Sequence, residues 1–153
     1  MAQRASLAED RFPENDTVTD FIAPDSVAER KDYFVRRDGI EYAGAHVLAD
    51  LWGASRLDDI AHIEASLREV VETCGATLLH IHLHHFTENG GVSGVAVLAE
   101  SHITVHTWPE RDFAAFDIFM CGACDPAKAV PVLRRYFTPD HVQVGEHKRG
   151  MVG

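Results

Sequence analysis

The fold is decided by residues 79–84, which read LHIHLH. Leucine and isoleucine alternate with histidine here, and a period of two is typical of a β-strand with one face in the core. The other face of this strand carries His80, His82 and His84. The stretch therefore predicts a sheet whose second face is polar and is either solvated or buried in a partner.

The same reasoning extends to both sides of this strand. Short apolar runs bounded by turn residues predict further strands at about residues 42–49, 93–99, 101–108, 113–121 and 141–145. Most of these strands follow one another through short connections, which favours antiparallel pairing.

Two segments have the periodicity of helices instead. Apolar residues recur at helical spacing over residues 57–74, and Gly75 follows as a cap. Asp125 begins a second helix that reaches to about Phe137, and Pro131 inside it predicts a kink or a late start. We therefore expect an α+β fold of two layers, with helices packed on one face of a largely antiparallel sheet.

Composition limits the partners. The chain has 153 residues, with 14 Lys and Arg against 24 Asp and Glu and a net charge of -10, so a nucleic-acid partner is not expected. No apolar run is long enough to span a membrane, and residues 1–10 carry acids where a signal peptide has basic and then apolar residues. With only three cysteines and no disulfide framework, we expect a cytoplasmic protein without a membrane partner.

The chain divides into two parts at about residue 40. Residues 1–40 are rich in acids and lack a sustained apolar period, which predicts a mobile acidic arm. Residues 41–153 contain all the predicted strands and helices and form the expected functional domain.

Three features indicate chemistry. His80, His82 and His84 could meet at a metal ion, although a polar face or an interface explains them more simply. Cys121 and Cys124 have the spacing of a redox pair, but no second pair completes a zinc site. The strand at residues 101–108 is flanked by acids and gathers hydroxyls and imidazoles, a polarity that is costly to bury unless it is used.

Several separated motifs resemble the prokaryotic S-adenosylmethionine decarboxylase proenzyme family. They are GVSGV at 91–95, AESH at 99–102, HTWPE at 106–110 and AAFDIFMCG at 114–122. The resemblance covers about residues 42–150 and leaves out the acidic arm. It implies a self-processing, pyruvoyl-dependent decarboxylase of S-adenosylmethionine that supplies the aminopropyl donor for spermidine synthesis.

The resemblance also implies roles for individual residues. The chain would be cleaved between Glu100 and Ser101, and Ser101 would become the pyruvoyl group that binds substrate as a Schiff base. His106 and Ser93 would act in processing, and Cys121 would return a proton to the decarboxylated carbon.

For substrate binding the resemblance implies Glu110, whose carboxylate suits ribose hydroxyls, and Phe86, whose ring suits adenine. It implies no metal in the site. It also implies that processed αβ protomers form a homo-oligomer with active sites at or near the interface.

One geometric problem and two alternatives accompany this interpretation. Ser101 and His106 are five residues apart, so an unbroken strand would send them to opposite faces, and we expect a bulge, a twist or a strand end at Ser101. An arginine or ornithine decarboxylase with the same cofactor is one alternative. The other is a non-catalytic metal-binding protein that uses the three-histidine face.

Overall fold

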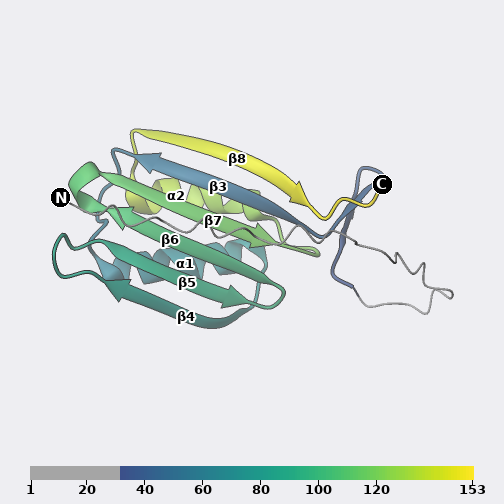
Figure 1. The fold of residues 1–153 in the computed structure, drawn as a ribbon, viewed down its shortest axis with the longest axis horizontal. Helices are drawn as coiled ribbons and strands as arrows, with labels where there is room; N and C mark the ends of the chain where they lie inside the picture. The colour runs from purple at the N-terminus through teal and green to yellow at the C-terminus, as the bar shows by residue number, and fades with distance from the viewer. Residues whose placement is uncertain (1–31) are drawn as a thin grey trace, which may run out of the picture. The chain divides into compact units, whose positions relative to one another are not determined.

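A six-stranded antiparallel sheet forms the centre of the computed structural model, which describes residues 32–153 (Figure 1). The predicted arm lies outside the described residues as far as residue 31. The strands run in the order β4-β5-β6-β7-β3-β8, so every neighbouring pair is antiparallel. They are β3 (Gly44–Trp52), β4 (Leu78–His85), β5 (Val92–Leu98), β6 (Ser101–Trp108), β7 (Phe113–Met120) and β8 (His141–Arg149).

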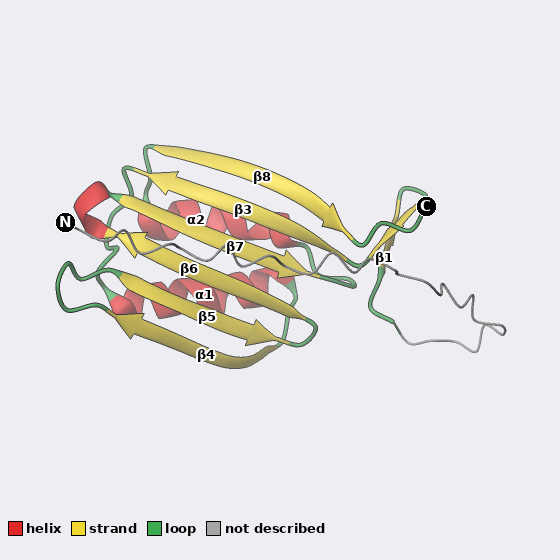
Figure 2. Ribbon diagram, viewed as in Figure 1, coloured by secondary structure: helices red, strands yellow, loops and turns green. Residues whose placement is uncertain are grey.

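The two helices, α1 (Ile60–Cys74) and α2 (Ala129–Phe137), cover one face of this sheet (Figure 2). Asp59 caps α1 by accepting a hydrogen bond from the His62 amide at 3.0 Å, and Gly75 ends the helix with a φ of 79°.

A 3₁₀ turn, η2 (Pro126–Lys128), precedes α2. Pro131 consequently lies in the first turn of α2. Backbone amides in the first turn make no hydrogen bond within the helix, so a proline is tolerated there, and the predicted late start is confirmed. The expected two-layer α+β fold is confirmed as well.

The main core fills the space between the helices and the sheet. Each central strand sends alternate side chains into it, as the period of two predicts. The largest fully buried side chains are Phe116, Phe137, Leu51, Ile63, Leu67, Ile103, Ile118, Met120 and Leu133.

The opposite face of the sheet is lined by imidazole and aromatic side chains. Cross-strand partners share a face, and one row across five strands reads Val97, His102, Phe119, His46 and His147. By the same registers and alternation, eight of the ten histidines of the chain lie on this face: His46, His80, His82, His84, His102, His106, His141 and His147. We call it the open face, because neither helix covers it (Figure 2).

A small hairpin precedes the sheet. Strands β1 (Val35–Arg37) and β2 (Ile40–Tyr42) pair antiparallel, and Glu41 also bridges to Val152. Residues 32–153 form one compact unit, and residues 35–40, which are predicted from the sequence to be part of the arm, lie in this hairpin.

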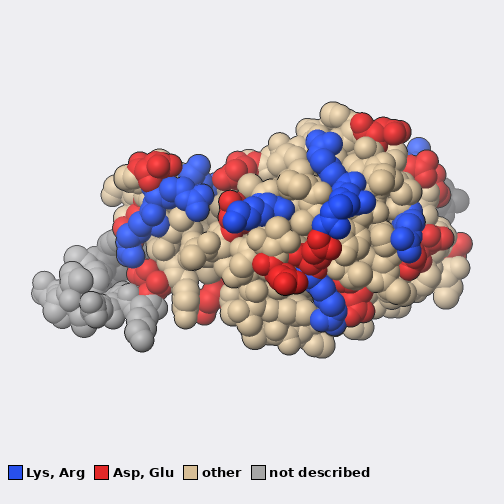
Figure 3. All heavy atoms as spheres, turned by 180° about the vertical axis from the view of Figure 1, so that it is seen from behind, with Lys and Arg blue, Asp and Glu red and all other residues tan. Residues whose placement is uncertain are grey.

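Charged side chains of both signs alternate over the helix side of the molecule (Figure 3). Ion pairs join Arg68 to Glu64 within α1, and Arg135 in α2 to Glu69 in α1. No continuous basic surface is visible on this face of residues 32–153. No helix among the described residues is long and apolar enough to cross a membrane.

Candidate active site

The Ser101 hydroxyl and the Cys121 thiol lie together at one end of the sheet. Ser101 is the first residue of β6 and Cys121 follows the last residue of β7, and both side chains are buried. The Ser101 Oγ lies 3.8 Å from the Cys121 Sγ and accepts a hydrogen bond from the Cys121 amide at 3.3 Å. The Cys121 thiol also donates to the Glu100 carbonyl oxygen at 3.1 Å. The Cys121 thiol therefore contacts both the serine hydroxyl and the Glu100 peptide carbonyl.

The peptide between Glu100 and Ser101 belongs to the tight turn that joins β5 to β6. Leu98 pairs with Ser101, so only Ala99 and Glu100 form the loop. Glu100 has a φ of 59°, in the left-handed region that a residue with a Cβ seldom adopts. Backbone strain of this kind costs on the order of 1 kcal/mol, so the bond predicted to break follows a strained residue.

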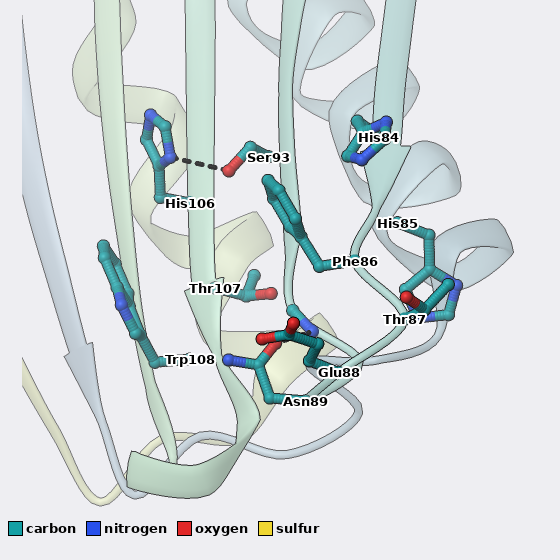
Figure 4. A pocket seen from close by; sticks show the side chains of 11 residues that line it. His84, His85, Phe86, Thr87, Glu88, Asn89, Ser93, His106, Thr107 and Trp108 are labelled. Carbon is teal, nitrogen blue, oxygen red and sulfur yellow. Dashed lines mark hydrogen bonds between the residues drawn. The ribbon is translucent and has the colours of Figure 1, made fainter.

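The Ser93 and His106 side chains form a second pair on the open face. They are direct cross-strand partners in β5 and β6, and the Ser93 Oγ lies 2.8 Å from His106 Nδ1 (Figure 4). A hydroxyl bonded to an imidazole can exchange a proton with it, which is the capacity that a processing step needs.

A pocket of about 580 Å³ opens beside this pair. Figure 4 shows the Phe86 and Trp108 rings on its two sides, with the Ser93–His106 pair above them. The His84 ring packs edge-on against Phe86, with 4.6 Å between the ring centroids. Residues lining the pocket are His84, His85, Phe86, Thr87, Glu88, Asn89, Gly91, Ser93, His106, Thr107 and Trp108. Its volume and its aromatic walls suit a ligand with a flat ring.

Glu110 and Asn89 lie together beyond the strand ends. Glu110 belongs to the 3₁₀ turn η1 (Pro109–Arg111), and its carboxylate accepts a hydrogen bond from the Asn89 side-chain amide at 3.4 Å. The Asn89 carbonyl oxygen in turn accepts from the Gly91 amide at 3.1 Å. Sequence reasoning assigned no role to Asn89 or to Trp108, although asparagine before two glycines is a turn signal.

Ser101 contacts Cys121, and Ser93 contacts His106, but these two pairs lie apart in the structure. Strand β6 begins at Ser101, so the expected strand end is present, but its register with β5 is unbroken from Ser101 to His106 and the expected bulge is absent. Ser101 faces the helices and His106 faces the opposite side, with about 16 Å of strand between them. Within one chain, the hydroxyl to be activated and the imidazole predicted to help are therefore separated.

The structure also shows where the three histidines of β4 and the other cysteines lie. His80, His82 and His84 share the open face on β4, and residues 32–153 contain no cluster of three or more His, Cys, Asp or Glu side chains arranged to hold a metal. The Cys124 thiol donates to the Gly75 carbonyl at 3.3 Å, and all three cysteines are free thiols. Burial, with the nearby Asp125 carboxylate, raises the pKa of the Cys74 thiol to about 11.

A two-layer α+β domain with a buried serine–thiol pair at a hairpin turn and an aromatic pocket defines a small enzyme. Residues 45–150 match the S-adenosylmethionine decarboxylase family, and the chain belongs to that family.

Relatives with similar chains support this assignment. The S-adenosylmethionine decarboxylase proenzyme of Methanococcus vannielii is 46% identical over 112 residues, which cover 71% of this chain and 91% of the relative. The proenzyme of Thermomicrobium roseum is 41% identical over 110 residues, covering 71% and 95%. The crystal structure of the adenosylmethionine decarboxylase from Aquifex aeolicus superposes with a TM-score of 0.64 at 34% identity, covering 72% of this chain and 92% of that one.

Proposed function

We propose that this chain cleaves itself between Glu100 and Ser101 and then decarboxylates S-adenosylmethionine, in the cytoplasm, to give the aminopropyl donor for spermidine synthesis. The observation that carries the proposal is the contact of the Ser101 hydroxyl with the Cys121 thiol and amide, next to a strained Glu100. The relatives named as proenzymes support the self-processing part.

Processing would begin at the Glu100 carbonyl. The Ser101 Oγ attacks this carbon, the C–N bond breaks, and the released amine takes the hydroxyl proton, which leaves an ester. The Cys121 thiol donates to the same carbonyl at 3.1 Å and so withdraws electron density from the carbon under attack. Loss of the Ser101 α-proton then expels the Glu100 carboxylate, and hydrolysis of the remaining enamine releases ammonia and leaves a pyruvoyl group.

Once formed from Ser101, the pyruvoyl group would supply the electron sink that decarboxylation needs. The residues around Ser101 fit this group, since the Cys121 amide already donates to the Ser101 oxygen. After carbon dioxide leaves, the substrate carbon needs a proton, and Cys121 carries one beside the position of Ser101.

The pocket favours S-adenosylmethionine over arginine or ornithine. Phe86 and Trp108 provide flat walls for a nucleobase. Glu110 does not line the pocket, but its carboxylate is bonded to Asn89, which does, and it can accept hydrogen bonds from ribose hydroxyls. Neither amino acid has a ring to fill such a pocket. Both lack ribose hydroxyls as well.

Mass spectrometry under denaturing conditions tests the processing step. We expect fragments of 100 and 53 residues from the 153-residue chain, with the smaller one modified by a carbonyl-trapping reagent. Ser101→Ala should leave one intact chain near 16.9 kDa. Release of labelled carbon dioxide from S-adenosylmethionine, arginine and ornithine in parallel then tests the substrate. A wild-type chain that stays intact would refute the proposal.

We further infer that processed αβ protomers form a homo-oligomer through the open face. Trp52 and Trp108 are 46% and 38% exposed there, although both rings stack on Phe113. A second copy on the open face would cover these rings together with the Ser93–His106 pair, whereas the Ser101 side chain faces the helices and would be reached only at the end of the sheet.

Complementation distinguishes shared sites from separate ones. Ser101→Ala and His106→Ala should each be inactive alone. If two chains build each site, co-expression should restore about a quarter of the wild-type activity, because half of the dimers are mixed and each mixed dimer has one intact site. Sedimentation of the wild-type chain gives its oligomeric state. A monomer that is fully active would refute the inference.

A further inference from the structure

The hairpin that precedes the matched region contacts the loop after Cys121. Residues 32–42 lie outside the family match at 45–150. Directly before the hairpin, the Tyr33 carbonyl oxygen accepts a hydrogen bond from the Gly122 amide at 2.6 Å. A Cβ placed on Gly122 would lie 3.7 Å from both the Tyr33 ring and the Tyr33 carbonyl, so Tyr33 covers this residue.

Gly122 directly follows Cys121 in the chain. It has a φ of 58°, a conformation that glycine adopts freely and also leaves freely. A contact at such a residue restricts its backbone to one conformation. The hydrogen bond to Tyr33 provides that contact one residue from the thiol that reaches the Glu100 carbonyl.

The hairpin has its own anchor, separate from the main core. Val35, Tyr42 and Ala45 form a second cluster of buried residues, with exposures of 7%, 4% and 6%. The Val152 amide donates to the Glu41 carbonyl at 2.9 Å, which ties the hairpin to the end of the chain. The hairpin can therefore be loosened without opening the space between the sheet and the helices.

We propose that Tyr33 and the hairpin of residues 35–42 form a positioning element, which this chain carries ahead of the family domain, and that it holds the Cys121 thiol at the reaction site. This inference rests on the proposed function of Cys121 as proton donor. The hairpin touches no substrate. It holds the Gly122 backbone, and through this backbone it fixes the direction of the Cys121 side chain.

The test uses the full chain with Val35→Asp, which buries a carboxylate in the small cluster and should release the hairpin. Ile40→Asp is the matched control, because it makes the same charge change at a position on β2 that is already 38% exposed. Tyr33→Gly is a second variant that leaves the small cluster and the carbonyl of residue 33 in place, but it removes the ring over Gly122 and frees the backbone that holds this carbonyl. Circular dichroism and thermal unfolding check that the main domain stays folded in each case.

Two measurements report on the loop itself, with or without catalysis. Hydrogen exchange of the peptide containing Gly122, and the rate at which iodoacetamide alkylates Cys121, should each rise at least fivefold in Val35→Asp and several-fold in Tyr33→Gly. Ile40→Asp should match the wild type. Under the proposed function, kcat for decarboxylation should fall several-fold in the first two variants, while KM changes less than twofold.

The outcomes distinguish a failure of the proposed decarboxylase function from a failure of the positioning role of the hairpin. A wild-type chain without decarboxylase activity would defeat the proposed function, yet exchange and alkylation would still decide whether the hairpin holds the thiol. Unchanged exchange and alkylation in both Val35→Asp and Tyr33→Gly would overturn the positioning role. A faster Cys121 reaction together with wild-type kcat would overturn it as well.

Discussion

Replacing Thr107 by valine isolates one buried hydroxyl at the wall of the pocket. Thr107 is 6% exposed, and its Oγ1 donates to the Leu57 carbonyl at 2.7 Å and accepts from the Val92 amide at 2.8 Å. The hydroxyl thus joins the start of β5 and the end of β6 to the loop before α1. Valine keeps the shape of the side chain but leaves a buried carbonyl and a buried amide without partners.

The expected loss follows from those two orphaned groups. Each costs roughly 1–3 kcal/mol when its partner is removed, so the free energy of unfolding should fall by about 3 kcal/mol. For a domain of this size, that loss lowers Tm by roughly 10 °C. Urea unfolding should be measured in a Ser101→Ala background, where every chain is expected to be uncleaved.

Two controls bracket this result. Thr107→Ser retains the hydroxyl and loses only a methyl group, which should cost about 1 kcal/mol. Thr104→Val removes a hydroxyl on the open face that donates to Asp117 at 3.0 Å, and its effect should stay below about 1 kcal/mol because water can reach the carboxylate. A Thr107→Val chain as stable as Thr104→Val would refute the reasoning.

Two other substitutions test packing and burial. Gly94→Ala should destabilise the domain by about 2 kcal/mol or more in urea, because its Cβ would lie 2.5 Å from the His82 carbonyl oxygen, whereas Gly145→Ala, with its nearest atom at 3.9 Å, should have little effect. The pKa of Cys74 is raised from 9.0 to about 11 by burial, so the unfolded chain releases this proton first and stability should fall as the pH rises from 9 to 11. Cys74→Ala should flatten that part of the stability curve, and an unchanged slope would contradict the assignment.

Local periodicity was sufficient to predict the layers of this fold, but it was not sufficient to predict which side chains meet in the site. The alternation at residues 79–84 correctly predicts a strand with His80, His82 and His84 on one face, because side-chain direction along a strand depends on parity alone. The same parity argument places Ser101 and His106 on opposite faces. Of the features expected there, the strand end at Ser101 is present and the bulge is absent, because a tight turn at Glu100 lets β5 and β6 pair without an extra residue.

The hairpin at residues 35–42 was missed although its signal is present. Asp38 and Gly39 have φ values of 52° and 74°, as the favoured two-residue hairpin turn requires, and Asp-Gly is a typical sequence for it. The acidic composition around this turn predicted a mobile arm, and this prediction was preferred to the hairpin signal. The contact of Ser101 with Cys121 depends on the pairing of β6 with β7, and no local pattern states which strands become neighbours.

The strand register also explains why the enzyme could need two copies of one chain. Moving the Ser93–His106 pair by one residue would turn both side chains into the core, where an imidazole beside the main cluster would be costly to bury. Ser101 cannot turn outward either, because its oxygen and the Glu100 carbonyl are both held by Cys121. With both groups fixed on opposite faces, a single chain has no small adjustment that joins them. A partner docked on the open face meets the Ser93–His106 pair and not the Ser101 side chain, so a second chain would complete the site only at the sheet end where Ser101 lies, and the co-expression experiment tests that step.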